Sequence, residues 1–182
     1  MALRNLGATA NRAELDIAEL VSAPMAAGMA TLVEDERELG ATVIDMGGGT
    51  TGMAVFSEGH LLHTAQLPVG GVHVTNDIAR MLSTTVVAAE RVKTLNGSAL
   101  SSPDDEREML TVPMVGEDDH NFSKIPRSMV VSIIKPRLEE TFELVRDRLE
   151  GAGLGRAAGT RGRADRGAPA SWWARARWRA AS

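Results

Sequence analysis

The sequence predicts an α/β fold, and three observations support that class. Ala41 to Ile44 is a short apolar run rich in β-branched residues that leads to an acid and three glycines, as a buried strand entering a tight turn does. Two further strand-like runs follow at 52–56 and 61–67. Beyond them, apolar residues recur at helical spacing, most regularly over 128–149.

The N-terminal 39 residues combine strand and helix signals. Residues 13–21 alternate at first and end apolar, which predicts a strand. Ser22 suits a helix N-cap and Pro24 suits the first helical turn, so a helix is expected to begin there. Small residues allow this helix to pack closely against a neighbour, and the charged residues 34–40 predict a solvated connection.

Three strands in succession form the central unit. The first covers 42–45, and the second, at 52–56, is reached through the glycine turn. Glu58-Gly59 is typical of a hairpin turn and leads into the third strand at 61–67. These runs predict an antiparallel meander that starts at the glycine turn.

Two helices are expected after the meander. Residues 68–71 break the strand pattern, and Thr75 is expected to cap the first helix. A second helix is expected over about 86–95, because Asn96-Gly97 is typical of a helix end.

The next 50 residues change from polar to strongly helical. Residues 101–126 are turn-rich, with one strand candidate at 108–115. A stripe at helical spacing then predicts the strongest helix, over 128–149, formed by Ile134, Leu138, Phe142, Val145 and Leu149. Pro136 lies inside this stripe and predicts a break into two helices.

The turn Asp45-Met46-Gly47-Gly48-Gly49-Thr50-Thr51 carries the clearest chemical signal. Glycines free the backbone for a tight turn, and consecutive backbone N–H groups in such a turn can cradle phosphate oxygens. The two threonine hydroxyls can add hydrogen bonds, and Asp45 is placed to hold a metal ion or a water. A bare glycine run is usually only a flexible turn, but the strand before it and Thr-Thr after it favour phosphate binding.

Composition excludes several classes of protein. No apolar run approaches the length of a transmembrane helix, and no secretory signal precedes the body. The chain has no Cys, which excludes disulfides and thiolate metal sites and fits a cytosolic setting. Residues 151–182 carry seven Arg and one Asp, so residues 1–150 account for a net charge of −10 within the total of −4. That acidic body is not typical of a nonspecific nucleic-acid binder.

Residues 151–182 are a different kind of sequence. Leu154 is the only Leu, Ile, Val, Met or Phe among them, whereas Ala, Gly and Arg supply 23 of the 32 residues. Such a segment buries too little apolar surface to offset its ordering entropy, which predicts disorder. A solvated native tail and a basic, Trp-bearing arm for an anionic membrane or nucleic acid are two interpretations.

A change of reading frame is the third interpretation of the tail and explains its composition best. GC-rich DNA read out of frame encodes Ala, Gly, Arg, Pro and Trp. Ala164-Asp165-Arg166-Gly167 can be written GCT GAC CGG GGG, which contains CTG ACC GGG, or Leu-Thr-Gly, when shifted by one base. Sequencing the gene tests this hypothesis, and a downstream frame without family-like protein sequence would contradict it.

Four segments together form a family pattern. The glycine turn after Asp45 alone marks only a superfamily, and a Val-Gly-Gly-x-x-x-Thr-x-Asp-Ile run narrows the assignment. The segments are Leu20 to Pro24 with Gly28, Gly40 to Thr51, Leu67 to Ala79 and Ala89 to Lys93. On these residues the chain resembles, over about residues 1–150, the FtsA family of cell-division proteins. That family is part of the actin-like ATPase superfamily, which also holds the heat-shock 70 chaperones.

The resemblance implies a partial actin-like (ribonuclease H-like) ATPase fold, mainly its second lobe, with a disordered C-terminal tail. Residues 1–39 would be a remnant of the first lobe and the connecting helix. Residues 40–71 and 127–150 would form subdomain 2A, and 72–126 subdomain 2B. Residues 151–182 would be a non-native-looking basic tail.

The implied ligands are ATP and Mg²⁺, with Asp45 acting on the metal directly or through its waters. Gly70 and Gly71 would open the helix that faces the nucleotide, and Glu90 and Lys93 would turn toward the ribose and adenine. The β- and γ-phosphate contacts would come from the turn itself, through Gly47, Gly48, Gly49, Thr50 and Thr51. From the residues alone, Glu90 and Lys93 are interpreted instead as an exposed i, i+3 ion pair.

The implied function is that of an adaptor linking FtsZ to the cytoplasmic membrane in the division ring, with self-association and weak or no ATP hydrolysis. The family's first phosphate loop, its adenosine loop expected after residue 150 and its membrane helix have no counterpart in the sequence, so the chain itself is expected to be inactive. Another actin-like ATPase, of the heat-shock 70 or pilus-assembly type, and a nonfunctional remnant are the alternatives.

Overall fold

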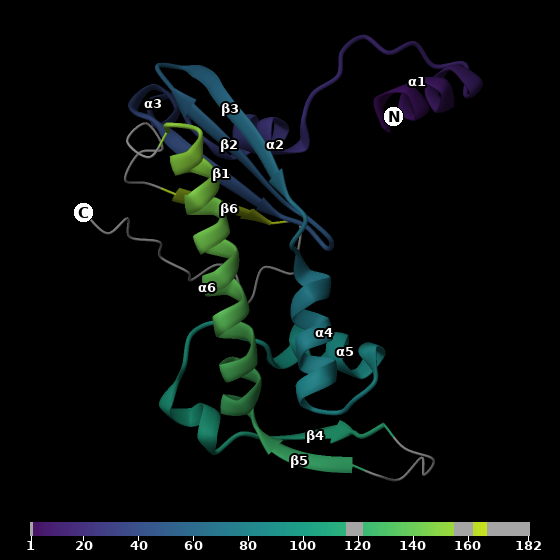
Figure 1. Ribbon diagram of the computed structural model, residues 1–182, viewed down its shortest axis with the longest axis vertical. Coiled ribbons are helices and arrows are strands. Elements are labelled where there is room, and N and C mark those ends of the chain that lie inside the picture. The colour runs from purple at the N-terminus through teal and green to yellow at the C-terminus, as the bar shows by residue number, and fades with distance from the viewer. Residues whose placement is uncertain (1, 116–121, 155–161, 167–182) are drawn as a thin grey trace.

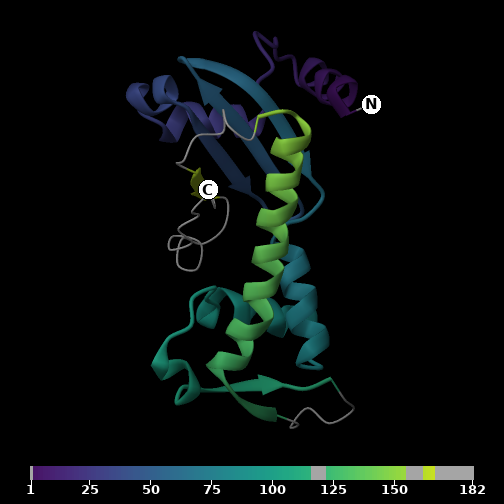
Figure 2. The same ribbon diagram turned by 60° about the vertical axis from the view of Figure 1, so that its left-hand side comes forward.

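In the computed structural model, the described residues are 2–115, 122–154 and 162–166, and they form a four-stranded sheet, a two-stranded ribbon and six α-helices (Figure 1). The sheet lies at one end, the ribbon with α4 and α5 lies at the other, and α6 runs between them, as the turned view also shows (Figure 2). In chain order the elements are α1 Ala2–Arg12, α2 Ala23–Thr31, α3 Glu34–Leu39, β1 Ala41–Met46, β2 Thr51–Ser57, β3 His60–Leu67, α4 Gly71–Met81, α5 Val86–Asn96, a 3₁₀ turn Pro103–Glu106, β4 Met109–Pro113, β5 Phe122–Pro126, α6 Arg127–Gly151 and β6 Gly162–Arg166.

The meander predicted from the sequence is confirmed. The sheet order is β3-β2-β1-β6, in which β2 pairs antiparallel with both β1 and β3. Glu58 and Gly59 join β2 to β3 with φ of 52° and 74°, the left-handed conformations of a mirror-type hairpin turn. That turn matches the right-handed twist of the strands, so it continues the meander without splaying them.

The two faces of the sheet are covered by different helices. On one face α2 packs on β1 and β2 over Val43, Ala54 and Phe56. A Cβ at Gly28 would lie 2.3 Å from a Phe56 ring carbon, which confirms the predicted close approach of a helix lined by small residues. On the other face, Ile44, Met46, Met53 and Val55 join one core with the apolar sides of α4, α5 and α6.

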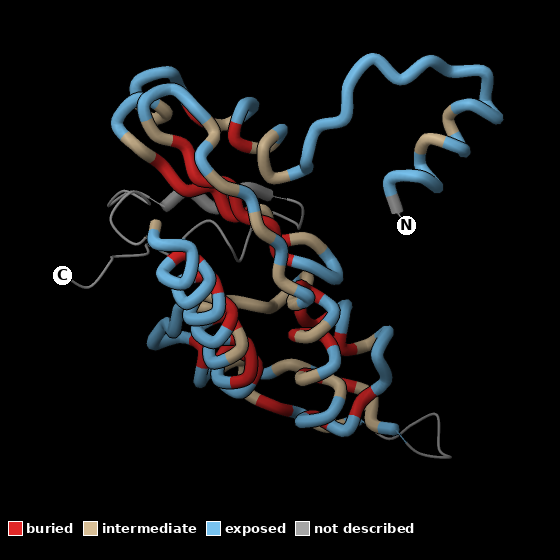
Figure 3. Tube along the Cα trace, turned by 45° about the horizontal axis from the view of Figure 1, so that its top comes forward, coloured by how far each residue is buried: buried red, intermediate tan, exposed pale blue. Residues whose placement is uncertain are grey.

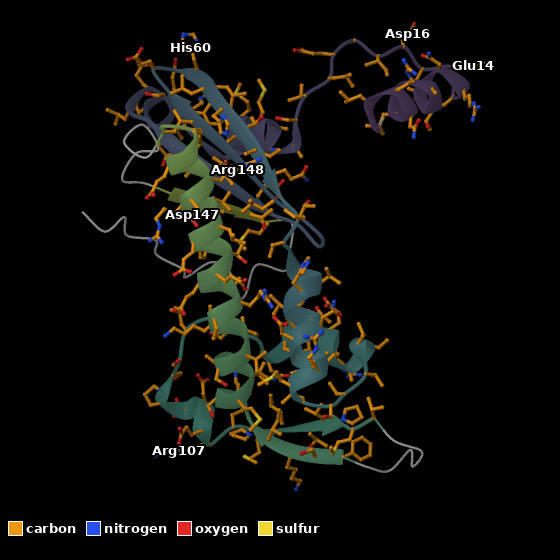
Figure 4. The ribbon with its side chains drawn as sticks, in the orientation of Figure 1. Glu14, Asp16, His60, Arg107, Asp147 and Arg148 are labelled. Atoms are coloured by element: carbon orange, nitrogen blue, oxygen red, sulfur yellow. The ribbon has the colours of Figure 1, made fainter. Side chains whose placement is uncertain are left out.

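The strand predicted over 13–21 is wrong. After α1, residues 13–22 form no helix or strand, and every side chain over 11–23 is exposed (Figure 3). Glu14 and Asp16 lie on this segment, away from the body that carries His60, Asp147 and Arg148 (Figure 4). An alternating sequence needs a neighbouring strand for its backbone hydrogen bonds, and none of the described strands pairs with it.

The solvated connection predicted over 34–40 is a short helix instead. Three acids, Glu34, Asp35 and Glu36, occupy its first turn, where the helix dipole favours negative charge. The Glu36 carboxylate accepts a hydrogen bond from the Val33 backbone N–H at 3.2 Å. The position of these acids therefore stabilises a helix in a segment for which the charged sequence predicted only a solvated connection.

The break predicted at Pro136 is also wrong, because α6 continues through it. Proline removes one i→i−4 hydrogen bond, but its exposed position leaves the freed carbonyl to water. On both sides of it Ile134 and Leu138 are buried in the core, as the predicted stripe requires, and this packing holds the helix together. Neither α6 nor another helix in the described ranges is long and apolar enough to span a bilayer.

The ribbon and β6 add strands beyond those expected. The strand candidate at 108–115 is confirmed as β4, which pairs antiparallel with β5, a strand that the polar sequence did not indicate. The expectation of a disordered tail differs from the structure over Gly162–Arg166, which pair parallel with β1. Parallel pairing uses backbone groups that every non-proline residue carries, so an apolar pattern is not required for it. The rest of the tail prediction, over 155–161 and 167–182, lies outside the described residues.

Candidate functional site

The glycine turn leaves the end of β1 as a loop with donors facing outward. Gly47 N–H closes the turn by donating to the Thr50 carbonyl oxygen at 2.8 Å. Gly48 and Gly49 are exposed, and their N–H groups have no acceptor in the part of the chain that the structure describes. Two adjacent, exposed and unpaired amides form the kind of concave donor set that binds anions.

Asp45 supplies a carboxylate on the strand that leads into this turn. It is half-buried at the end of β1, opposite Gly52 of β2. Within the described ranges its side chain takes part in no ion pair or hydrogen bond. Carboxylate oxygens are among the ligands that hydrated divalent cations take.

A backbone brace holds the loop against the start of α4. Gly71 N–H donates to the Gly47 carbonyl at 3.0 Å, and Val72 N–H donates to the Gly48 carbonyl at 2.7 Å. A Cβ at Gly70 would lie 2.6 to 2.8 Å from three loop backbone atoms, which leaves room only for glycine. The orphan donors at the start of α4 are therefore satisfied by the loop itself.

The two threonines of the turn differ in their surroundings. Thr51 is fully buried and donates its hydroxyl hydrogen to the Val69 carbonyl at 2.7 Å. Thr50 is exposed, and its hydroxyl oxygen accepts from Gln66 Nε2 at 2.9 Å. Of the two hydroxyls predicted to bind phosphate, only that of Thr50 faces solvent, and Thr51 ties the loop to the segment before Gly70.

The predicted cap of α4 is wrong. The helix begins at Gly71, and Thr75 lies one turn inside it with its hydroxyl donating to the Gly71 carbonyl at 3.0 Å. The N-cap residue is Gly70, and its backbone N–H donates to His73 Nδ1 at 3.1 Å. Sequence reasoning favoured Thr75 because threonine is a common cap, but the loop contacts move the cap five residues earlier, to Gly70.

Glu90 and Lys93 form an ion pair at 2.6 Å, yet they are not the exposed surface pair that their spacing alone indicates. Lys93 is buried, with 8% of its side chain exposed, whereas Glu90 keeps 53%. The Lys93 ammonium also donates to the Gly71 carbonyl at 3.2 Å and to the Thr75 hydroxyl at 2.8 Å. The Thr75 hydroxyl also lies within hydrogen-bond distance of the Glu90 carboxylate, so its single hydrogen is shared between this carboxylate and the Gly71 carbonyl.

The charge of Glu90 is stabilised in this network. Burial by itself would raise the pKa of the Glu90 carboxyl, but hydrogen bonds from Lys93 and Thr75 and the positive charge of Lys93 lower the pKa below its ordinary value. The Glu90 carboxylate therefore supplies the negative charge that faces the buried Lys93 ammonium.

All ten residues predicted for the site belong to one connected region. The loop over 45–51 accepts backbone hydrogen bonds from Gly71 and Val72 and packs directly against Gly70, and the Gly71 carbonyl in turn accepts from Lys93 of α5. Sequence reasoning missed Gln66 and Thr75 as parts of the site. Their only sequence signal was their position near Gly70 and Gly71, either at the end of the preceding strand or one turn into the following helix.

Comparison with known proteins identifies the family. Residues 42–167 match the model of the family described as cell division protein FtsA. This chain belongs to that FtsA family. The match extends past residue 150, where the sequence pattern had ended, and includes β6.

Individual relatives agree with this assignment. The chain is 49% identical over 161 residues to cell division protein FtsA of Agrobacterium fabrum, covering 88% of this chain and 36% of the relative. It is 38% identical over 152 residues to the FtsA protein of Bacillus subtilis, covering 84% of this chain and 34% of the relative. The chain thus spans about a third of the length of the curated relatives it matches.

Solved structures confirm the actin-like fold. The chain superposes on MreB5 of Spiroplasma citri bound to ADP with a TM-score of 0.69 and 22% identity, covering 81% of this chain and 46% of that one. A PilM–PilN type IV pilus biogenesis complex gives a TM-score of 0.59 at 20% identity, covering 90% and 40% of the two chains. At these identities the likeness shows the fold alone. It therefore gives no support to the alternative functions of the heat-shock 70 or pilus-assembly type.

Proposed function

We propose that this chain carries the part of an actin-like ATP site that holds the β- and γ-phosphates. The observation that carries the proposal is the braced loop after Asp45, in which the exposed Gly48 and Gly49 amides have no acceptor among the described residues. Such donors act on phosphate oxygens without rearrangement, because the contacts of Gly70 to Val72 already fix the loop.

The roles of the site residues follow from their surroundings. Gly47 to Thr50 would receive the phosphates, with Thr51, Gly70 and Gly71 holding the loop in shape. Asp45 would hold Mg²⁺ through its waters, and the metal would neutralise phosphate charge when bound. Glu90 and Lys93 would form the part of the site that α5 contributes.

The fold suggests how the site is divided between subdomains. We assign residues 40–71 and 127–150 to subdomain 2A and 72–126 to subdomain 2B, with 1–39 as the link to a first lobe. In this assignment, the contact between α4 and α6 is a contact between the two subdomains.

Membership of the FtsA family supports a role in cell division, and we propose the finer role of an adaptor between FtsZ and the cytoplasmic face of the membrane. Residues 72–126 would contact FtsZ, and self-association would accompany assembly in the division ring. The acidic body argues against nucleic acid as a partner.

The chain alone is expected to bind Mg-ATP no tighter than millimolar and to hydrolyse it slowly or not at all. Within the described residues no second phosphate loop faces Gly48 and Gly49, so phosphate contacts there are made in open water and screened by salt. Calorimetry with Mg-ATP tests this expectation, and micromolar affinity would contradict it.

Nuclear magnetic resonance of the uniformly ¹⁵N-labelled chain tests phosphate binding directly. Titration with millimolar Mg-ATP is expected to shift the Gly48, Gly49 and Thr50 amides and to leave those of β3 in place. Asp45→Asn should weaken the Mg²⁺-dependent part of the shifts. Asp147→Asn, at an exposed position of α6, serves as the matched control. Loop resonances that do not move at saturating Mg-ATP would overturn the proposal.

A pull-down with purified FtsZ tests the partner. We expect the immobilised chain to retain FtsZ, and we expect retention to fall when exposed apolar positions within residues 72–126 are altered.

Circular dichroism of residues 1–150 during heating shows beforehand whether the body folds. A chain without a cooperative thermal transition would be a nonfunctional remnant.

A further inference from the structure

Thr50 differs from its neighbour Thr51 in how its hydroxyl is used. Thr51 donates its hydroxyl hydrogen to the Val69 carbonyl at 2.7 Å, so that hydrogen is spent inside the protein. The Thr50 hydroxyl oxygen instead accepts a hydrogen bond from Gln66 Nε2 at 2.9 Å. A hydroxyl has one hydrogen to donate, and that of Thr50 has no acceptor among the residues that the structure describes.

The register of the sheet brings Gln66 to Thr50. Gln66 of β3 lies opposite Gly52 of β2, and Thr50 precedes Gly52 by two residues. Residues two apart along a strand share a face, so Gln66 and Thr50 are diagonal neighbours, at a separation that a long side chain can bridge. No side chain intervenes at Gly52, where a Cβ would lie 2.4 Å from Pro24 Cγ. The Thr50 backbone is fixed as well, because its carbonyl accepts from the Gly47 N–H at 2.8 Å.

We infer that Gln66 is a positioning residue, which holds the Thr50 hydroxyl so that its hydrogen is presented to a phosphate oxygen. The inference rests on the proposed phosphate-binding function and adds to it a residue outside the glycine turn. Because the Gln66 amide occupies an acceptor site of the Thr50 oxygen, the hydroxyl hydrogen is left for an acceptor that the ligand supplies. A hydroxyl that accepts a hydrogen bond is polarised into a stronger donor, so the two bonds reinforce each other.

The position of this hydrogen bond at the surface limits what it can do. Both side chains are exposed, so water replaces the Gln66 amide at little cost when that amide is removed. The bond therefore adds little to the free energy of unfolding. It does restrict the rotation of the Thr50 side chain before a ligand arrives, and a preset donor favours binding. Its effect is expected in ligand affinity rather than in stability.

The first experiment tests the hydrogen bond in the ligand-free chain. In the ¹⁵N-labelled 182-residue protein, the side-chain amide signals of Gln66 should shift in Thr50→Val, which removes the hydroxyl and keeps the side-chain shape. Thr64→Val is the matched control, since Thr64 is an exposed residue of the same strand two positions from Gln66. Gln66 signals that ignore Thr50→Val, or that respond equally to Thr64→Val, would overturn the inference.

A double-mutant cycle then measures whether the hydrogen bond serves phosphate binding. The dissociation constant of Mg-triphosphate, followed by the amide shifts of Gly48 and Gly49, should rise roughly threefold in Gln66→Met, as the loss of one exposed hydrogen bond predicts. In a Thr50→Val background, Gln66→Met should have no further effect, whereas in a Thr50→Ser background, which keeps the hydroxyl, the full effect should return. Urea midpoints should stay equal among these variants, which a purely structural role would not predict.

Two results of the cycle would overturn the inference. One is an unchanged dissociation constant in Gln66→Met. The other is an equal loss in the Thr50→Val background, because Gln66 would then act without the hydroxyl.

Failure of the proposed function is recognised separately. If the loop amides of the wild-type chain respond to neither Mg-triphosphate nor Mg-ATP, phosphate binding and the donation by Thr50 are both wrong. If they respond but Gln66→Met changes nothing, only the role of Gln66 is wrong. The Gln66 side-chain signals report its contact with Thr50 in either case, since that measurement needs no ligand.

Discussion

The glycine loop and the N-terminal segment are both short, turn-containing and partly exposed, yet they are held very differently. The loop over 47–50 is fixed by backbone hydrogen bonds from α4 and by the absence of space at Gly70. Residues 11–23 carry apolar side chains such as Leu15, Ile17 and Leu20, all exposed. The difference teaches that a local pattern becomes structure only where another element supplies the missing hydrogen bonds or apolar surface.

The largest expected effect comes from filling the space at Gly70. In Gly70→Ala, the new Cβ would stand less than 3 Å from three backbone atoms, which cannot rotate away. We expect a loss of about 1–3 kcal/mol in the free energy of unfolding, measured by urea denaturation.

Gly48→Ala is the matched control for that change, since a Cβ at Gly48 meets nothing within 4 Å. Equal urea midpoints for the two variants would show that the loop is not braced as the structure indicates.

A smaller effect is expected at the contact between α4 and α6. Arg137 donates to the two Asp77 carboxylate oxygens at 2.5 and 3.1 Å, and this hydrogen bonding, stronger than the opposing effect of burial, raises the pKa of the guanidinium. Arg137→Met should cost about 1 kcal/mol, reduced from the value of a buried pair because both side chains are partly exposed.

Lys135→Met tests the same helix at an exposed pair 3.9 Å from Glu139. Thermal denaturation should detect little change there, and a loss as large as that of Arg137→Met would show that the α4 contact adds nothing specific.

The pH dependence of the Glu90–Lys93 pair gives a finer test. The pKa of Glu90 in the folded protein lies below its ordinary value of 4.5, so its contribution is present above that pH and lost as the pH falls through the folded pKa. The stability difference between wild type and Glu90→Gln should therefore shrink in acid, followed by urea denaturation at several pH values. A difference that stays constant down to pH 3 would contradict the folded ion pair.

The smallest effect on stability is expected from changes in the exposed N-terminal segment. Removal of residues 1–22 deletes α1 and the exposed segment, which make few contacts with the body. The urea midpoint should change by no more than about 0.5 kcal/mol in free energy, as for surface changes in general. A clear loss of stability would show that the N-terminal segment packs on the body in solution.

Much of the fold could be predicted from residues whose signals are local. β-branched runs on either side of the glycine turn gave the meander, and the stripe from Ile134 to Leu149 gave α6. The candidate site could be assembled because its glycines mark positions where backbone must approach backbone. Thr75, Pro136 and residues 13–21 were misassigned because a helix start, a helix interior and a strand each depend on neighbours that the local sequence does not name.

The sequence by itself determined the α/β class and the family, and it predicted the ten residues of the candidate site. Only the tertiary structure decided that Lys93 is buried under the start of α4 rather than displayed at the surface, and that Thr51 braces the loop rather than facing solvent. It also decided that β6 lies beside β1. In each case the physical reason is that burial and hydrogen-bond partners come from residues distant in the chain, which folding brings within reach of one another.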